Sequence, residues 1–158
     1  MTRAIVLSLV ICIIGAVLEG LFAGTEVKQR LAAIRLPKRV PPFWLWVVIG
    51  ALYYLTCFGI SMRLLILSTS PSRTNALALL ATIMFVNALW NYFFFRSRNF
   101  KHAYFLGLVY SAFVLLLFVL VMRLDSVAAW LLCPYMIYLF YGNAWGYRVW
   151  KLNPRPMS

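Results

Sequence analysis

The stretch that decides the fold is residues 75–95, which read NALALLATIMFVNALWNYFFF. It contains no charged residue over its whole length. As an α-helix, a stretch of this length rises about 30 Å, which is the thickness of the hydrocarbon core of a bilayer. A chain built around it is therefore expected to cross a membrane.

Four further apolar stretches have a similar length. They cover roughly residues 4–24, 43–67, 103–122 and 127–149, and each is long enough to span a bilayer as a helix. The chain has 158 residues, of which 65% are hydrophobic, whereas soluble domains are closer to half apolar. We therefore predict an all-α membrane protein, with one five-helix transmembrane bundle over residues 1–158. Short connections make successive helices antiparallel neighbours.

The positive charges divide unequally between the two ends of such a bundle. The first loop, the third loop and the C-terminal tail share one end, which collects eleven of the fifteen Lys and Arg residues. The eleven are Lys28, Arg30, Arg35, Lys38, Arg39, Arg96, Arg98, Lys101, Arg148, Lys151 and Arg155. Because cytoplasmic loops are enriched in Lys and Arg, we expect the N-terminus outside and the C-terminus in the cytoplasm.

The same charge pattern indicates the partners. The net charge of +12 follows the topology of a membrane protein, so no nucleic-acid partner is expected, whereas anionic membrane lipids are. A bacterial inner membrane is favoured, with an organellar membrane as the alternative.

Two amides and an indole lie close together on the 75–95 helix. Asn91 follows Asn87 by four residues and Trp90 follows it by three, so on a helix these side chains are neighbours. Amides in a membrane-spanning helix must find partners inside the bundle, because lipid offers none. They could line a ligand pocket with a polar handle or form an interhelical hydrogen bond, and the residues alone leave both interpretations open.

Glu19 is the only acidic residue well inside an apolar stretch. One interpretation is an ion pair with Lys28 or Arg30 that ties down the first loop. The other is a role in ligand binding or proton transfer. Tyr138 lies deep in the last stretch and needs a partner for its hydroxyl, so pocket lining and an interhelical hydrogen bond both fit it.

The first loop, roughly residues 25–42, is the only long connection. Leu31, Ile34 and Leu36 are expected to lie over the mouth of the bundle as a lid, while the basic residues face water or phosphate. Pro134 is expected to kink the last helix.

Small residues recur every fourth position in two helices, which lets helix backbones approach closely. We assign the longer ridge to contacts within the chain and treat the shorter one as a candidate homodimer surface. The longer ridge is Ser8, Cys12, Ala16, Gly20 and Gly24, and the shorter is Thr74, Ala78 and Thr82.

The sequence offers no catalytic constellation. It has one histidine, His102, and no Ser/His/Asp set, paired carboxylates or glycine-rich phosphate loop. A lone interfacial histidine is more often structural or solvated than a haem ligand. Cys12, Cys57 and Cys133 lie in apolar stretches and fit small buried hydrophobes better than disulfides or metal ligands. We therefore expect no enzyme activity, no metal and no required cofactor.

These features together resemble the TspO/MBR family, also called the tryptophan-rich sensory protein, translocator protein or peripheral-type benzodiazepine receptor family. The resemblance is carried by motifs in the same order along the chain. They are Leu31 to Pro37 in the first loop, Pro41-Pro42-Phe43-Trp44, Tyr54, Asn87-x-x-Trp90 with Phe94-Phe95, Pro134-Tyr135 and Leu152-Asn153.

The chain departs from the family where several tryptophans are usual. Lys38 and Arg39 stand where the family often has a Trp pair, Gly50 replaces a Trp of the second helix, and Tyr138 replaces one of the fifth. The family's later Asn of the fifth helix corresponds to Gly146. Because these indoles are implicated in tetrapyrrole breakdown, we expect binding of such a ligand without rapid degradation.

The resemblance implies a receptor or sensor-like protein that binds a tetrapyrrole, sterol or lipid in a pocket open to the cytoplasmic face. A porphyrin or haem-like group is one such ligand. A transporter of such ligands, or a membrane scaffold without a ligand, is the alternative. The ligand-binding residues are then expected to be Trp44, Tyr54, Phe58, Asn87, Trp90, Phe94 and Tyr138, with Lys38 and Arg39 as anion contacts in the lid.

Overall fold

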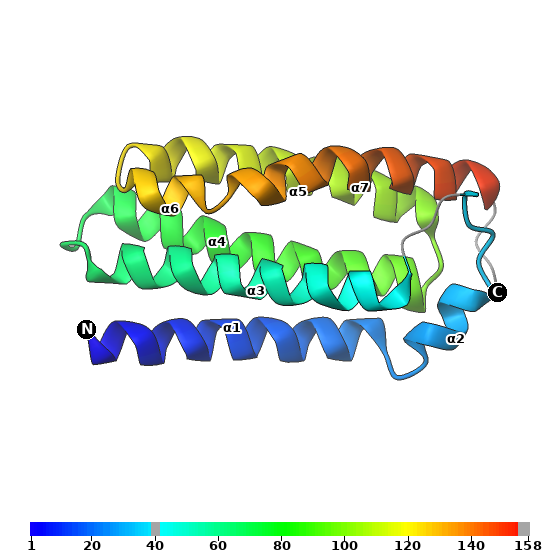
Figure 1. Ribbon diagram of the computed structural model, residues 1–158, viewed down its shortest axis with the longest axis horizontal. Helices are drawn as coiled ribbons and strands as arrows, with labels where there is room; N and C mark the ends of the chain where they lie inside the picture. Colours follow the sequence, from blue (N-terminus) through cyan, green and yellow to red (C-terminus); the bar gives the residue numbers. More distant parts are fainter. Residues whose placement is uncertain (39–41, 155–158) are drawn as a thin grey trace.

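In the computed structural model, which describes residues 1–38 and 42–154, the chain forms a bundle of long helices (Figure 1). The elements are α1 (Thr2–Ala23), α2 (Val27–Ala32), α3 (Phe43–Ile66), α4 (Pro71–Asn91), the π-helical turn η1 (Tyr92–Arg96), α5 (Phe100–Met122), α6 (Ser126–Trp130) and α7 (Cys133–Leu152). The predicted all-α architecture is confirmed. α1 begins at one end of the bundle and α7 ends at the other (Figure 1).

Five helical segments are long and apolar enough to cross a membrane, as predicted. They are Thr2–Ala23, Phe43–Ile66, Pro71–Arg96, Phe100–Met122 and Ser126–Leu152. The third begins four residues before its predicted start because Ser70 caps it. The Ser70 side chain accepts a hydrogen bond from the Arg73 backbone amide, and Pro71 fits the first helical turn.

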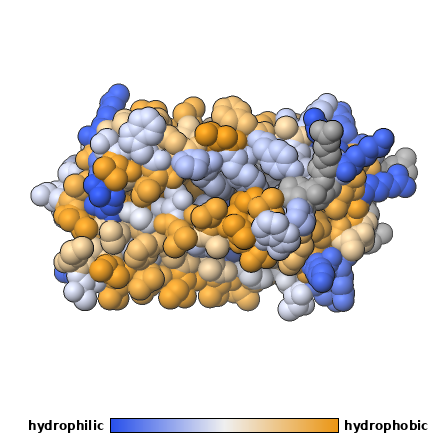
Figure 2. Space-filling model, in the orientation of Figure 1, coloured by the Kyte–Doolittle hydropathy of each residue, from blue (hydrophilic) through white to orange (hydrophobic). Residues whose placement is uncertain are grey.

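The surface between the two ends of the bundle is apolar. Large hydrophobic side chains such as Ile13, Leu55 and Phe140 are exposed, the last at 80% of its area. Figure 2 shows the strongly hydrophilic residues gathered at the two ends of the molecule. Since lipid is as apolar as these side chains, this surface suits a bilayer rather than water.

Two buried clusters fill the inside of the bundle. The larger contains fully buried residues of α3 and α5, such as Leu64 and Leu117. The smaller joins Ile34 from the first loop, Phe94 of η1 and Trp145 of α7. The aromatic run that ends the third span therefore packs inside the protein, at the end of the bundle that carries α2.

α1 packs against α3 and α4, as expected for a ridge used within the chain. Ser8 is fully buried, and the Cys12 thiol lies 3.7 Å from the carbonyl of Tyr54. Gly15, which is not part of the predicted ridge, lies close to α4, because a Cβ at Gly15 would meet the end of the Met84 side chain. Gly20 has open space around it instead, so the ridge serves packing only in its first half.

The fifth span is interrupted, which is more than the kink predicted from Pro134. α6 ends at Trp130, and α7 begins at Cys133 with the proline in its first turn, where the missing N–H costs nothing. Asp125 caps α6 by accepting from the Ala128 amide, and it also accepts from Nε of Arg63 on α3 at 2.8 Å.

The first loop is folded onto the end of the bundle. It contains α2, and Leu31 and Leu36 pack beside buried Ile34, as predicted. Asn153 accepts from the backbone amide of Arg35 at 3.2 Å and donates to the carbonyl of the same residue at 2.9 Å. The side chain of Asn153, the residue after α7, therefore holds the lid segment through the backbone of Arg35.

The basic residues follow the predicted division between the two ends. Of those described, nine lie in or beside α2, at the η1–α5 connection and in the last turns of α7, and four lie at the opposite end. The nine are Lys28, Arg30, Arg35, Lys38, Arg96, Arg98, Lys101, Arg148 and Lys151. Arg39 and Arg155 lie outside the described residues.

Candidate functional site: an aromatic cavity inside the bundle

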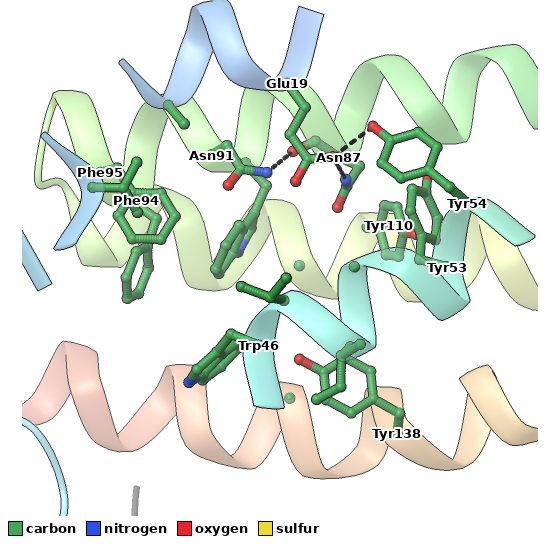
Figure 3. Close-up of a pocket in the computed structure, with 18 of the residues that line it drawn as sticks. Glu19, Trp46, Tyr53, Tyr54, Asn87, Asn91, Phe94, Phe95, Tyr110 and Tyr138 are labelled. Atoms are coloured by element: carbon green, nitrogen blue, oxygen red, sulfur yellow. Dashed lines mark hydrogen bonds between the residues drawn. The ribbon is translucent and has the colours of Figure 1, made fainter. Parts of the chain in front are cut away.

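A cavity of about 460 Å³ lies inside the bundle, lined by members of both buried clusters (Figure 3). Its walls come from α1, α2, α3, α4, η1, α5 and α7. Contacts between rings bridge α3 and α7 beside it, with Trp46 on Trp145 at 4.9 Å and Tyr53 on Tyr135 at 5.3 Å between centroids. The volume is in the range of cavities that hold a small organic ligand.

A polar group on one wall joins three helices (Figure 3). Glu19 of α1 accepts from the Tyr54 hydroxyl of α3 at 2.6 Å and from Nδ2 of Asn87 of α4 at 2.9 Å, both at Oε2. All three side chains line the cavity. Asn87 therefore makes the interhelical hydrogen bond of one interpretation and also lines the cavity, while its contact with a ligand stays a prediction.

Of the two interpretations of Glu19, the ion pair with Lys28 or Arg30 is wrong. Among the described residues, Glu19 has no basic partner, and Arg30 lies 3.6 Å from Glu26 instead. Arg30 also donates to the Phe95 carbonyl of η1 at 3.2 Å. α1 ends at Gly24, whose φ of 80° is readily adopted only by glycine, and α2 starts in a new direction after it. After this turn, Arg30 contacts Glu26 and the Phe95 carbonyl and not Glu19.

Asn91 and Trp90 complete the wall contributed by α4. Asn91 is buried and donates to the Asn87 carbonyl of its own helix at 3.0 Å. Trp90 stacks on Phe94 with their ring centroids 4.7 Å apart. η1 follows directly, so the π-turn sets the direction of the last cavity-lining rings of this span.

Three buried polar atoms on the cavity-lining side chains have no described partner. They are Nε1 of Trp46, Nε1 of Trp145 and the hydroxyl of Tyr53. A buried donor without a partner costs about 1–3 kcal/mol. These three atoms are themselves shielded from the cavity, so a ligand would reach them only after the surrounding side chains had shifted.

Most of the ligand-binding residues predicted from the sequence lie around the cavity. Its lining includes Tyr54, Asn87, Trp90, Phe94 and Tyr138. Figure 3 shows Tyr138 across the cavity from Asn87. Their contact with a ligand stays a prediction.

Other predicted site residues lie elsewhere. Trp44 is 63% exposed, and Phe58 is not part of the lining. Lys38 is exposed and does not line the cavity either, while Arg39 lies outside the described residues.

Sequence reasoning missed several of the rings that line the cavity. They are Trp46, Tyr53, Tyr110, Tyr135 and Trp145. The sequence contains a signal for Trp46 and Tyr53, because their spacing with Gly50 places all three on one face of α3. Trp44 is two residues before Trp46, and it is exposed on another face. Three indoles therefore line the cavity, so missing tryptophans alone are a weaker argument against tetrapyrrole breakdown.

Two comparisons with known proteins bear on the chain. The family model described as the TspO/MBR family matches residues 8–151. The sequence matches none of the curated proteins with which it was compared. Proteins of the matched family are generally non-enzymatic binding or translocator proteins. With five apolar helices and a family match over almost its whole length, the chain belongs to the TspO/MBR family of integral, multi-pass membrane proteins.

Proposed function

We propose that this protein is a receptor or sensor-like membrane protein that binds a hydrophobic or amphipathic ligand in the cavity between its helices. The observation that carries the proposal is the cavity itself, which holds about 460 Å³ and is lined mainly by aromatic and aliphatic side chains. Apolar cavities with a few convergent polar groups are the usual form of small-molecule sites. The family resemblance suggests a tetrapyrrole, a sterol or a lipid as the class of ligand.

The position of the first loop supports access from the cytoplasmic end of the bundle. Val27 and Leu31 of α2 contribute to the lining, and Asn153 holds the backbone of the same loop. The positive-inside rule assigns this end to the cytoplasm. A ligand entering there would have to pass the lid formed by α2 and the segment that follows it.

Transport of the ligand is the first alternative. Transporters with alternating access often place broken helices at corresponding positions in two halves. Among the described spans, a break between two helices occurs at Leu131–Leu132 of the fifth, and a π-turn ends the third. These two irregularities lie toward opposite ends of the bundle (Figure 1), so binding without transport is the function we favour.

Tetrapyrrole breakdown is the second alternative, because three indoles line the cavity and indoles are readily oxidised. We expect that protoporphyrin binds without rapid breakdown. Illumination of the purified protein with protoporphyrin, followed by the Soret band, distinguishes the two activities. Protein-dependent bleaching that is lost in Trp90→Phe would establish the enzyme instead.

Native mass spectrometry of gently extracted protein tests the proposed function. The expected result is one tightly held hydrophobic molecule per chain, which remains after lipids from the surface have been removed. A stable second polypeptide and no retained small molecule would favour the scaffold. The extracted species also tests a homodimer, for which exposed Ala78 and Thr82 on α4 provide a surface.

A further inference from the structure

We propose that the ligand carries a protonated amine and that Glu19 is its counter-charge. This assignment rests on the proposed function and narrows its amphipathic ligand to one class, a lipid or other amphiphile that carries an amine, which sterols and porphyrins do not. Glu19 is the only charged side chain among the described residues that line the cavity. The whole chain has fifteen basic residues and three acidic ones, so the cavity has the sign opposite to that of the protein.

The hydrogen bonds of Glu19 use only one of its two carboxyl oxygens. Its Oε2 accepts twice, from the hydroxyl of Tyr54 and from the amide of Asn87. The first bond measures 2.6 Å, a length typical of a hydroxyl donating to a charged oxygen. Two donors on one oxygen hold the carboxylate against the cavity wall, and Oε1 accepts from none of the described residues.

The carboxylate has no cation of the protein beside it. The ion pairs among residues 1–38 and 42–154 are Arg30 with Glu26 and Arg63 with Asp125. An uncompensated charge within a membrane-spanning helix is costly, and such groups commonly serve ion or substrate recognition. An ammonium group bound at Oε1 would supply the missing opposite charge.

The surrounding side chains suit an ammonium group in two further ways. Asn87 must turn its Nδ2 toward Glu19, because a carboxylate only accepts, and this leaves the amide oxygen of Asn87 as an acceptor. The rings of Tyr54 and Tyr138 (Figure 3) and of Trp90 also line the cavity, and aromatic faces attract cations. An anion would find no Lys or Arg among the described lining residues.

Three probes with the same aromatic body and different charge test the assignment. They are anthracenylmethylamine, which is cationic, ethylanthracene, which is neutral and nearly isosteric, and anthracenylacetate, which is anionic. Their fluorescence reports binding to the full chain in nanodiscs of zwitterionic lipid, with empty nanodiscs as the blank. The amine is expected to bind about tenfold or more tightly than the neutral probe, because hydrogen bonds between charged groups are stronger than those between neutral groups.

Two variants locate the preference. Glu19→Gln keeps an acceptor for Tyr54 and Asn87 but removes the charge, so the ratio of the amine's affinity to that of ethylanthracene should fall to about one. Glu26→Gln is the matched control, since Glu26 lies on the N-terminal side of α2 and does not line the cavity. It should leave all three affinities unchanged.

The outcomes separate this assignment from the proposed function. If the neutral and cationic probes bind the wild type equally, or if the preference survives Glu19→Gln, the amine assignment is wrong and ligand binding stands. If no probe binds above the blank, both the amine assignment and the proposed ligand binding are contradicted. If Glu19→Gln does not fold, the ratio of the three affinities in the wild type still decides.

Discussion

At the scale of single residues, the contacts of Glu19 link the architecture to the cavity. Tyr54 and Asn87 bring α3 and α4 to one carboxylate of α1. A hydrogen bond to a charged group is worth more than a neutral one, and removing one partner leaves the other less satisfied. The same three side chains therefore stabilise the fold and shape the polar wall of the cavity.

Tyr54→Phe is expected to lower stability. It removes the 2.6 Å bond to Glu19 and keeps the ring, so the cost should be about 1–3 kcal/mol, seen as a lower melting temperature in detergent. Tyr141→Phe is the control, because Tyr141 is exposed and makes no hydrogen bond among the described residues. Equal melting of both variants would show that the bond contributes nothing.

The outcome for Glu19 shows where sequence reasoning stops. Its presence inside an apolar stretch is visible in the sequence, but its partners come from α3 and α4, 35 and 68 residues away. Lys28 and Arg30 are nearer in the sequence, but the chain turns at Gly24, and Arg30 contacts Glu26 and the Phe95 carbonyl instead. Asn87 and Trp90 were predictable because they share a face of one helix, whereas Trp145 required knowledge of how α7 meets α3.

At the scale of elements, the described part of the first loop is anchored to the end of the bundle. α2 is bound through Arg30 to the Phe95 carbonyl of η1, and the backbone of Arg35 is bound through Asn153. Opening of the lid would require these few hydrogen bonds to break. The lid over the cavity therefore depends on the residue that follows α7.

Asn153→Ala is expected to release the lid. The amide of Asn153 bonds both backbone groups of Arg35, so its loss should speed proteolysis between Lys28 and Lys38 several-fold while the spans stay intact. Cleavage rates by mass spectrometry measure this. Asn75→Ala, an exposed amide on α4, is the control, and equal cleavage in the two variants would exclude the anchor.

The interrupted fifth span is joined to α3 by Asp125 and Arg63. Partial burial raises the pKa of Asp125, but the hydrogen bonds from Arg63 and from the Ala128 amide outweigh it, so the net pKa lies below its usual value of 3.8. A lowered folded pKa adds stability that is present above 3.8 and is lost as the pH falls through the lower folded value.

Asp125→Asn is therefore expected to make the melting temperature depend less on pH in the acid range. The wild type should lose melting temperature as the pH falls below the usual Asp range, and the variant should lose less, starting from a lower value at neutral pH. Thermal unfolding across that range measures both. Parallel curves for the two proteins would contradict a role of the Arg63 pair.

At the scale of the whole molecule, the apolar surface and the two charged ends fix how the bundle lies in a membrane. The length and composition of the spans were predictable because a bilayer imposes both. A pocket could be expected from the family resemblance and from Asn87 and Trp90. The walls from α3 and α7 could not, because they depend on how the aromatic side chains of these two helices meet. Open space at Gly50, where the family often has tryptophan, contributes to the cavity.

The orientation is a prediction at the same scale. Nine described basic residues at the α2 end against four at the other predict a cytoplasmic C-terminus. A reporter fused after Ser158 should be active only in its cytoplasmic form. Activity of a reporter that requires export from the cytoplasm would reverse the topology.

The measurement that tests the central claim most directly is ligand binding after filling the cavity from Gly50. A Cβ at Gly50 meets nothing within 4 Å, so Gly50→Leu should fold at least as well as the wild type, because glycine costs a helix about 1 kcal/mol. The added side chain should occupy the cavity and weaken binding of ethylanthracene in nanodiscs about tenfold. Ala51→Leu, the next residue of α3 and exposed to lipid, should bind as the wild type does. Undiminished binding by a folded Gly50→Leu protein would show that the ligand site is elsewhere.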